Sequence, residues 1–468
     1  MELMKHQQMA VERAKTGTDL GLFFEVGTGK TATAITILRN IFNIHRQVVP
    51  TLIIGPLAVI YNWKREIAKW APKIPEGKIK VLTGSLDKRI ANLDKLTNDI
   101  VITNIDAFAY TKFVDAIMKF GPMVLIVDES HMCKTPNAKR SKNIYQVARR
   151  TSYRYILTGT PILNSPMDIF MQFKILDLGK TFGDNFYIFR NKFFHDENAK
   201  WSGRQGYFPK FVPTPELFPI LSQMIESKSV RALKKDCLDL PPMVDMLITV
   251  DLTPEQSKLY KQMKDNFLAW YEQANKASVA TIALTKALRL QQIVSGHLVL
   301  DDGTVVPVDC KPRLDAVEGI LEQVINEHKV IIWCVFKHDY KVLGELLTKM
   351  KIKHVFLTGE QNGKEKEEAI NSFETDISVR CIIGNRRAGG TGVNLIQASY
   401  AITYSRNFSL GDELQSEARN HRMGSQVHEK ITKVNICAHN TIDEVITEAL
   451  KNKQDISTTI IDRIKEVK

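Results

Sequence analysis

Residues 23–34 read "FFEVGTGKTATA": the end of an apolar run, a glycine turn and the start of a helix-like segment. Consecutive backbone N–H groups in such a turn form an anion-binding nest, and the N-terminus of the following helix adds the positive end of its dipole. Gly27 and Gly29 allow the turn. Lys30 is placed to reach the β- and γ-phosphates of a nucleotide, and Thr31 to bind magnesium. Many unrelated nucleotide-binding proteins share this loop, so the process that it serves must be inferred from the rest of the chain.

Short β-rich runs that end in polar or glycine residues recur in both halves of the chain. They are 51–56, 99–104, 123–130 and 154–160 in the first half, and 329–336, 353–359, 379–385 and 399–405 in the second. Helix-like segments lie between them, and this alternation predicts an α/β fold with a parallel sheet in each half. Ligands of such sheets bind beyond the carboxyl ends of the strands, where the polar residues stand.

An aromatic-rich region, 182–211, and a run of prolines separate the two sets of strands. The boundary between the halves is expected near 225–245. A first lobe is expected over residues 1–230, with an aromatic protrusion at about 180–220. A second lobe is expected over residues 231–455, followed by a tail over residues 456–468. One long helix is expected over 267–294.

The charge of the 468-residue chain is concentrated in its first half. Residues 1–230 hold 32 Lys+Arg against 20 Asp+Glu, which accounts for the net charge of +12. The segment 131–150 has six basic residues and no acid. Nucleic acid is the natural partner of such a surface, although a charge run alone is more often a solvated face. The six cysteines show no metal-ligand or redox spacing, and no apolar run reaches the length of a membrane span.

The segment "IVDES" (126–130) strengthens the prediction of a nucleotide site. It is a strand that ends in two carboxylates. Asp128 is suited to hold magnesium, directly or through water, and Glu129 to polarise an attacking water as general base. The alternative is that both acids are simply solvated at the end of a strand. A glycine loop next to another strand of the same sheet makes this alternative weaker.

Further segments follow one another in a recognisable order: "LMKHQ" (3–7), "FEVGTGKT" (24–31), "LIIGPLAVIYNW" (52–63), "VITN" (101–104), "DESH" (128–131), "LTGTPILNS" (157–165), "VRALKKDCLDLPP" (230–242), "AGGTGVNL" (388–395) and "QSEARNHRMGS" (415–425). In these motifs the chain resembles superfamily 2 helicase-type ATPases of the Swi/Snf-like class over nearly its whole length. The resemblance implies two tandem RecA-like lobes that share one site for ATP and Mg²⁺. The compact, lysine-rich composition suits a phage, viral or bacterial form of such a protein.

The resemblance also implies roles for particular residues. Arg419 and Arg422 stand three apart, so they are expected on one helix face, with Arg422 as the arginine finger and Arg419 placing it. The implied ATP contacts are Gln7 to the adenine, with Gly27, Thr28, Gly29, Lys30, Thr31, Gly392 and Arg422. The implied magnesium ligands are Thr31 and Asp128. The implied nucleic-acid contacts, on loops at strand ends that grip phosphates, are Pro56, Thr103, Asn104, Thr160, Gly390, Thr391 and Asn394.

The implied function is an ATP-dependent DNA translocase or helicase that tracks duplex or branched DNA without reading its sequence. Residues 182–208 loosely resemble the fork-remodelling and annealing branch of the class, but aromatic packing in a helical protrusion explains them equally well. An RNA helicase of the same fold and a nucleotide-switched DNA-binding protein that does not travel are the alternatives. A monomer in the cytoplasm of a bacterium, or of a phage's bacterial host, is expected.

Overall fold

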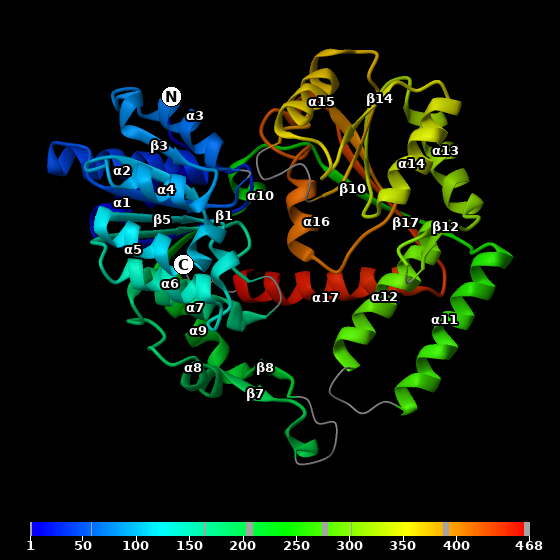
Figure 1. Cartoon of the computed structure of the whole chain (residues 1–468), viewed down its shortest axis with the longest axis horizontal. Helices are drawn as coiled ribbons and strands as arrows, with labels where there is room; N and C mark the ends of the chain where they lie inside the picture. Colours follow the sequence, from blue (N-terminus) through cyan, green and yellow to red (C-terminus); the bar gives the residue numbers. More distant parts are fainter. Residues whose placement is uncertain are drawn as a thin grey trace. The chain divides into compact units, whose positions relative to one another are not determined.

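The computed structural model of the chain describes residues 2–57, 59–162, 165–202, 209–273, 279–300, 302–386 and 393–462. Residues 1–239 and 453–468 form one compact unit, here lobe 1, and residues 240–452 form the other, here lobe 2 (Figure 1). The last strand of the first sheet ends at Ala232 and the first strand of the second begins at Met243. The chain therefore passes from one sheet to the other between these two residues.

The sheet of lobe 1 is parallel throughout. Its strands, in spatial order, are β3 (Ile79–Leu82), β4 (Ile100–Asn104), β2 (Thr51–Gly55), β5 (Val124–Asp128), β6 (Tyr153–Leu157), β1 (Asp19–Phe24) and β9 (Ser229–Ala232). The α-helices of this lobe are α1 (Lys5–Lys15), α2 (Lys30–His45), α3 (Ile60–Trp70), α4 (Leu86–Leu93), α5 (Thr111–Phe120), α6 (Lys139–Ala148), α7 (Ile169–Asp177), α8 (Phe186–Phe193), α9 (Phe218–Glu226) and α10 (Lys234–Cys237).

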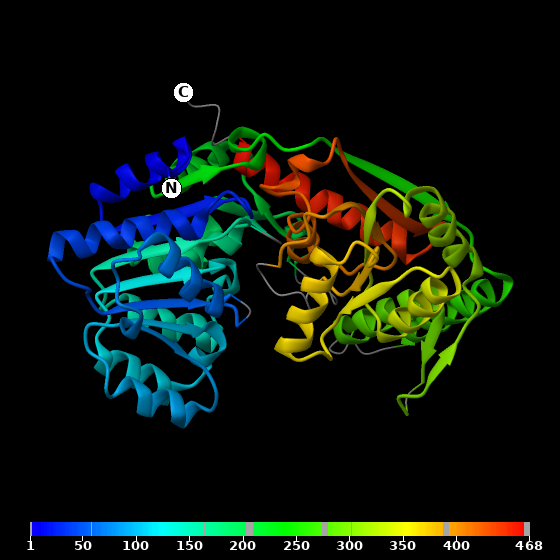
Figure 2. The ribbon, with the colours of Figure 1, turned by 90° about the horizontal axis from the view of Figure 1, so that it is seen from above.

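Burial on both faces explains why the central strands of lobe 1 are nearly continuous apolar runs. Every residue of β2, β4 and β5 is buried. Side chains alternate between the faces of a strand, so Leu52 and Ile54 enter one hydrophobic cluster while Ile53 enters another. Helices accordingly cover both faces of this sheet (Figure 2).

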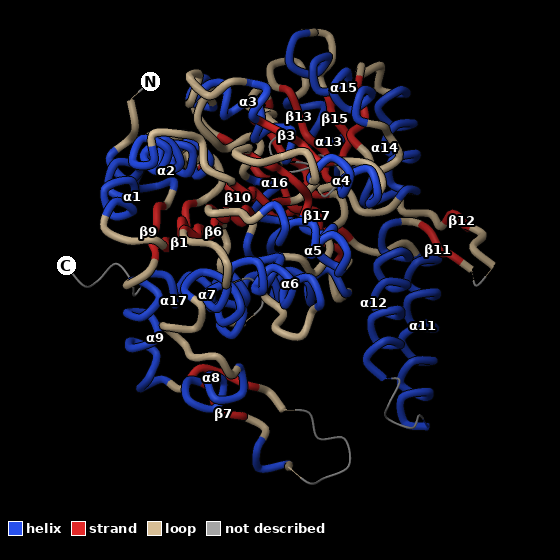
Figure 3. Tube along the Cα trace, turned by 60° about the vertical axis from the view of Figure 1, so that its left-hand side comes forward, coloured by secondary structure: helices blue, strands red, loops and turns tan. Residues whose placement is uncertain are grey.

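The aromatic-rich region of lobe 1 folds into α8 and the antiparallel pair β7 (Phe194–Asp196) and β8 (Phe211–Pro213) (Figure 3). Some of its described phenylalanines pack inward: the Phe189 ring lies 5.2 Å from that of Phe170 and 4.9 Å from that of Phe182, centroid to centroid. Phe193 is buried in the same cluster. These rings contribute to the core of lobe 1, whereas Tyr187 on α8 is 57% exposed.

Lobe 2 is built around a second sheet of parallel strands. They are, in spatial order, β10 (Met243–Val250), β17 (Ile431–Ala438), β16 (Ala398–Thr403), β13 (Lys329–Trp333), β15 (Cys381–Gly384) and β14 (His354–Leu357). The remaining elements are α11 (Pro254–Gln273), α12 (Val279–Ser295), the hairpin of β11 (His297–Val299) and β12 (Val305–Pro307), α13 (Lys311–Val324), α14 (Lys337–Lys349), α15 (Gly363–Thr375) and α16 (Leu410–Glu417). The last helix, α17 (Ile442–Asp462), begins in lobe 2, and its residues from 453 onward belong to lobe 1.

The predicted fold class is confirmed: both lobes are parallel sheets flanked by helices. All eight runs predicted as strands are strands, with ends that differ by at most three residues. The prediction of one long helix over 267–294 is wrong, because the described residues of this segment belong to two helices, α11 and α12, which lie side by side in Figures 1 and 3. Among the described residues, no helix is long and apolar enough to cross a membrane.

Candidate functional site

The glycine turn of lobe 1 joins β1 to α2 at the carboxyl edge of the sheet. Gly27 and Gly29 have φ angles of 92° and 89°, in the left-handed region that favours glycine. Gly29 is also the N-cap of α2, and a Cβ atom there would lie 1.9 Å from Nε2 of Gln7. Both the backbone conformation and this close approach require glycine at position 29.

The first turn of α1 holds the glycine turn in place. Nε2 of Gln7 donates to the carbonyls of Thr28 and Gly29, each at 3.4 Å, and its Oε1 accepts the Met4 N–H at 2.8 Å. Nε2 of His6 lies 2.8 Å from the Thr28 carbonyl oxygen. The structure thus brings Gln7 to the predicted phosphate loop. It adds His6, whose contact with the loop the sequence analysis did not predict.

Lys30 is the first residue of α2 and is buried. Its Nζ donates to the Phe24 carbonyl at 2.9 Å, so the ammonium group turns back over the end of β1. The positive charge of Lys30 acts on both carboxyl groups that end β5, where it favours the ionised forms and opposes a rise in their pKa. Lys30 and the acidic pair therefore belong to one electrostatic site.

Asp128 ends β5, and each of its carboxylate oxygens accepts one hydrogen bond. Oδ2 accepts from Nε1 of Trp63 at 2.9 Å, and Oδ1 accepts from the Glu129 N–H at 3.0 Å. Burial, together with the neighbouring charge of Glu129, raises the pKa of Asp128 to about 6. Trp63 stands on α3 and is the last letter of the "LIIGPLAVIYNW" motif, but sequence reasoning assigned it no role.

Glu129 has a φ of 51°, unusual for a residue with a side chain, and its carboxylate lies against His131. Nδ1 of His131 is 3.2 Å from Oε2 of Glu129 and 3.0 Å from Oγ1 of Thr158. Burial alone would raise the pKa of Glu129, but the hydrogen bond and charge of His131, with Lys30, outweigh burial and lower it. Two adjacent carboxyl groups thus have pKa values shifted in opposite directions, the pattern of a site that separates their roles.

The candidate phosphate-gripping residues of lobe 1 differ in how they are placed. Pro56 follows β2, and the Thr160 N–H donates to Oγ1 of Thr158 at 3.1 Å, which joins it to the His131 network. Contrary to the prediction of a loop, Thr103 and Asn104 are the last two residues of β4. The reason is that β4 pairs with β2 as far as Asn104, and with β3, a strand that sequence analysis missed, as far as Thr103.

Both of these β4 side chains have partners inside lobe 1. Oγ1 of the fully buried Thr103 donates to the Leu82 carbonyl at 3.4 Å, and Oδ1 of Asn104 accepts a hydrogen bond from Nη1 of Arg89. Their roles as nucleic-acid contacts stay predictions.

Arg419 and Arg422 of lobe 2 do not share a helix face, contrary to the prediction. The helix α16 ends at Glu417, and both arginines lie in the turns that follow. Tertiary and turn contacts take up the carbonyl groups that a continued helix would have used. The Arg419 carbonyl accepts the Leu395 N–H and the Arg422 carbonyl accepts the Ser425 N–H, each at 2.9 Å.

The side chain of Arg419 is directed into lobe 2. It is 4% exposed, its Nη2 donates to the Arg386 carbonyl at 2.6 Å, and its guanidinium carbon lies 5.2 Å from the centre of the Trp333 ring. Burial lowers the pKa of Arg419 to about 10. Arg422 is only partly buried.

The predicted phosphate-gripping loop of lobe 2 is described only in part. Gly390, Thr391 and Gly392 lie outside the described residues. Asn394 is described, and its buried Oδ1 has no hydrogen-bond partner within that part of the chain.

The fold and the site of lobe 1 define a nucleotide-binding α/β protein of the helicase type. The family model of the SNF2-related domain matches residues 8–297, and that of the helicase conserved C-terminal domain matches residues 313–424. The chain therefore belongs to the SNF2-related family of helicase-type ATPases.

Curated relatives match nearly the whole chain at low identity. The CHD3-type chromatin-remodeling factor PICKLE of Arabidopsis thaliana is 26% identical over 94% of this chain and 32% of its own length. The DNA annealing helicase and endonuclease ZRANB3 of Homo sapiens is 26% identical over 94% of this chain and 39% of its own length. The chain spans about a third of the length of the curated relatives it matches.

Among solved structures, the SWI2/SNF2 ATPase core of Sulfolobus solfataricus in complex with dsDNA aligns with a TM-score of 0.45. It is 24% identical, and the alignment covers 98% of this chain and 93% of that one.

Proposed function

We propose that this chain is a DNA-dependent ATPase that converts ATP hydrolysis into movement along duplex or branched DNA. The observation that carries the proposal is the assembly of Lys30, Asp128 and Glu129 beside one glycine turn at the end of the lobe 1 sheet. Because the pKa of Glu129 is lowered, this carboxylate is ionised at neutral pH and can accept a proton from an attacking water.

The residues of this site fit ATP and Mg²⁺. The turn from Gly27 through Thr28 and Gly29 to Lys30 would hold the phosphates, and Gln7 the adenine. Magnesium supplies charge neutralisation on the phosphates when it is bound.

Asp128 suits the metal because two protein hydrogen bonds leave acceptor capacity on its carboxylate oxygens, and Thr31 would contribute a hydroxyl. Within the described residues no group of three or more His, Cys, Asp and Glu side chains forms a cation site of its own. A nucleotide-bound magnesium ion needs none, since phosphates and waters supply its other ligands.

Lobe 2 would supply the positive charge that hydrolysis needs on the γ-phosphate. We assign this role to Arg422, with Gly392 as a further nucleotide contact and Arg419 as the residue that places the turn. As functional units we propose residues 1–230 and 231–455, with residues 456–468 as a tail; this division falls close to Asp239, where the first segment of lobe 1 ends. Nucleotide-dependent closure of one lobe on the other would move two grips on DNA relative to each other.

DNA is favoured as the partner by the charge distribution and by the relatives. Lys139, Lys142, Arg149 and Arg150 on and after α6 are all exposed, as a phosphate-binding surface requires. Phosphate grips are assigned to Pro56, Thr103, Asn104, Thr160, Gly390, Thr391 and Asn394. Such grips carry no sequence information, so binding should be independent of sequence. The annealing helicase among the relatives supports branched DNA as the preferred form.

The function is tested by the nucleic acid that stimulates ATP hydrolysis and by direct assay of movement. Duplex DNA, forked DNA, single-stranded DNA and RNA of equal length are compared as activators, and displacement of a triplex-forming strand reports travel along duplex DNA. Stimulation by duplex or forked DNA together with triplex displacement supports the proposal. Stimulation by RNA alone favours an RNA helicase. Hydrolysis that never displaces the third strand and does not vary with DNA length favours a stationary switch.

A further inference from the structure

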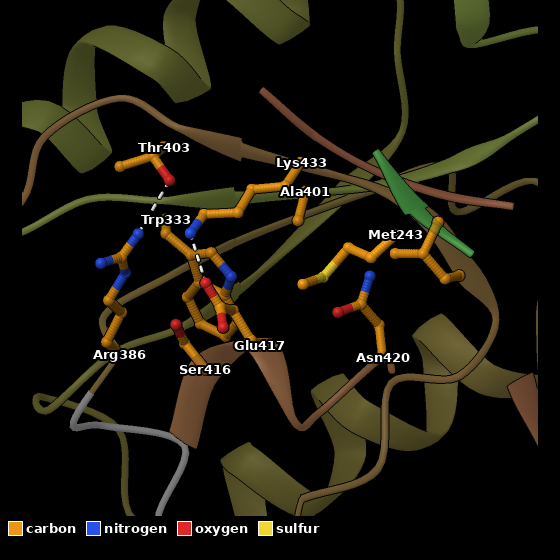
Figure 4. A pocket seen from close by; sticks show the side chains of 10 residues that line it. Met243, Trp333, Arg386, Ala401, Thr403, Ser416, Glu417, Asn420 and Lys433 are labelled. Atoms are coloured by element: carbon orange, nitrogen blue, oxygen red, sulfur yellow. Dashed lines mark hydrogen bonds and ion pairs between the residues drawn. The ribbon is translucent and has the colours of Figure 1, made fainter. Parts of the chain in front are cut away.

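A cluster of buried charged side chains lies between the lobe 2 sheet and α16 (Figure 4). Glu413 on α16 is the shared acceptor: it forms ion pairs with Arg386 and with Lys433, the latter at 2.9 Å. Glu417, one helical turn further on, also pairs with Lys433. The side chains of Arg386 and Glu413 are only 3% and 8% exposed.

Arg386 is held at both of its ends. Its guanidinium pairs with Glu413, and its Nη2 donates to Oγ1 of Thr403 at the end of β16 at 2.8 Å. Its backbone carbonyl accepts Nη2 of Arg419 at 2.6 Å. Arg386 follows β15 by two residues, so the end of this strand is tied to α16 and to the turn that carries Arg419 and Arg422.

The cluster is too tightly packed to be a ligand site. The cavity beside it, lined by Met243, Trp333, Thr403 and Asn420 among others, has a volume of about 10 Å³, room for a single water at most. Burial, and after it the like charge of Arg406, lowers the pKa of Arg386 to about 9. An arginine in such a place costs stability relative to an apolar residue, because desolvation offsets the attraction of its partner.

We propose that Arg386 and Glu413 are positioning residues, which hold the turn carrying Arg419 and Arg422 in the orientation that ATP hydrolysis needs. This inference rests on the proposed function of Arg422. The ion pair with Glu413 ties α16 to Arg386, and Arg386 forms directional hydrogen bonds with Thr403 and Arg419. Together these contacts set the orientation of α16 relative to β15 more strictly than apolar contacts would, since apolar contacts have no direction.

The test separates positioning from folding. A single change such as Glu413→Gln leaves Arg386 buried without its partner and destabilises lobe 2. The informative protein is therefore the double variant Arg386→Met/Glu413→Leu, which removes both charges and keeps comparable volumes. The matched control is Arg313→Met/Asp443→Leu, which removes another buried arginine–carboxylate pair of lobe 2. Thermal unfolding, ATP binding, and kcat and KM for DNA-stimulated hydrolysis are measured on the full chain.

The expected result is a double variant that unfolds as cooperatively as the wild type and binds ATP equally well, with kcat lower by roughly 10-fold to 100-fold and KM for ATP unchanged. The control variant should keep the wild-type kcat. Wild-type kcat in Arg386→Met/Glu413→Leu, or an equal loss in the control, overturns the positioning role and leaves the proposed function standing. A wild-type chain that DNA fails to stimulate overturns the proposed function, and the inference falls with it.

Discussion

At the scale of single residues, the two carboxyl groups at the end of β5 differ because their neighbours differ. Asp128 meets an indole N–H and the backbone, in a buried place that raises its pKa to about 6. Glu129 meets His131, which lowers its pKa. Two neighbouring carboxyl groups thus have pKa values shifted in opposite directions, as the different roles proposed for them require.

Glu129→Gln should separate binding from chemistry. The amide keeps the size of the side chain but cannot take a proton, so hydrolysis should fall by ~10²–10⁴-fold. ATP and DNA binding should persist. Rates from a coupled ATPase assay and affinities from fluorescent nucleotide titration decide the matter, and a variant that no longer binds ATP would contradict a purely catalytic role.

Lys30→Ala should abolish ATP turnover, because it removes the phosphate contact of the glycine turn. The Nζ hydrogen bond to the Phe24 carbonyl is also lost, so the free energy of unfolding should fall by about 1 kcal/mol. The exposed Lys73→Ala serves as control and should leave both quantities unchanged. Turnover at the wild-type rate in Lys30→Ala would remove Lys30 from the site.

At the scale of elements, the ends of helices and strands decide where the candidate residues point. Pairing with β2 and β3 places Thr103 within the sheet, and α16 ends at Glu417, so Arg419 and Arg422 lie in the turns that follow. The position of His297 is also set by the ends of elements, because it is the first residue of β11, two positions after the end of α12. Its side chain is buried, and its ring lies 5.0 Å from that of Phe336 and 4.8 Å from that of His338, centroid to centroid.

His297 should make lobe 2 less stable in acid. Burial, with the nearby charge of His338, lowers the pKa of His297 from 6.5 to about 4. The unfolded chain therefore binds more protons in this range, and stability rises with pH across it. The contribution should be lost as pH falls from 6.5 through about 4. Denaturant unfolding across this window should show a shallower pH dependence for His297→Leu, and an unchanged slope would refute the assignment.

At the scale of the whole molecule, the proposed function depends on lobe 2 acting on a nucleotide held by lobe 1. Arg422→Ala should bind ATP with nearly wild-type affinity, because the glycine turn, Lys30 and Asp128 all belong to lobe 1. DNA should stimulate the wild-type ATPase strongly and the variant hardly at all, since an arginine finger is worth ~10³–10⁵ in rate. Equal stimulation of both proteins, measured side by side, would place the finger elsewhere.

DNA affinity should decrease steeply with salt and vary little among duplexes of equal length and shape, because phosphate contacts dominate it. The double variant Lys139→Ala/Lys142→Ala should reduce the slope of log K against log salt by about 2. Lys73→Ala, again the control, should keep the wild-type slope. An unchanged slope in the double variant would show that the exposed α6 residues do not contact DNA.

The sequence by itself determined the parallel sheets, the glycine turn and the acidic end of β5, because each is specified by residues close together in the chain. Apolar runs in strands that are buried on both faces are visible without any partner, as in β2 and β5. Gly27 and Gly29 likewise indicate a turn with left-handed backbone conformations, without any partner distant in the chain.

Only the tertiary structure decided which neighbours complete the site. Trp63 reaches Asp128 across 65 positions, and Arg386 reaches Arg419 across 33. The strands β2 and β3 both pair with β4 at Thr103. Four phenylalanines of the protrusion enter the core of lobe 1: Phe182, Phe189, Phe193 and Phe194. Such contacts depend on how sheets and helices pack, and a local pattern holds no information about a partner that is distant in the chain.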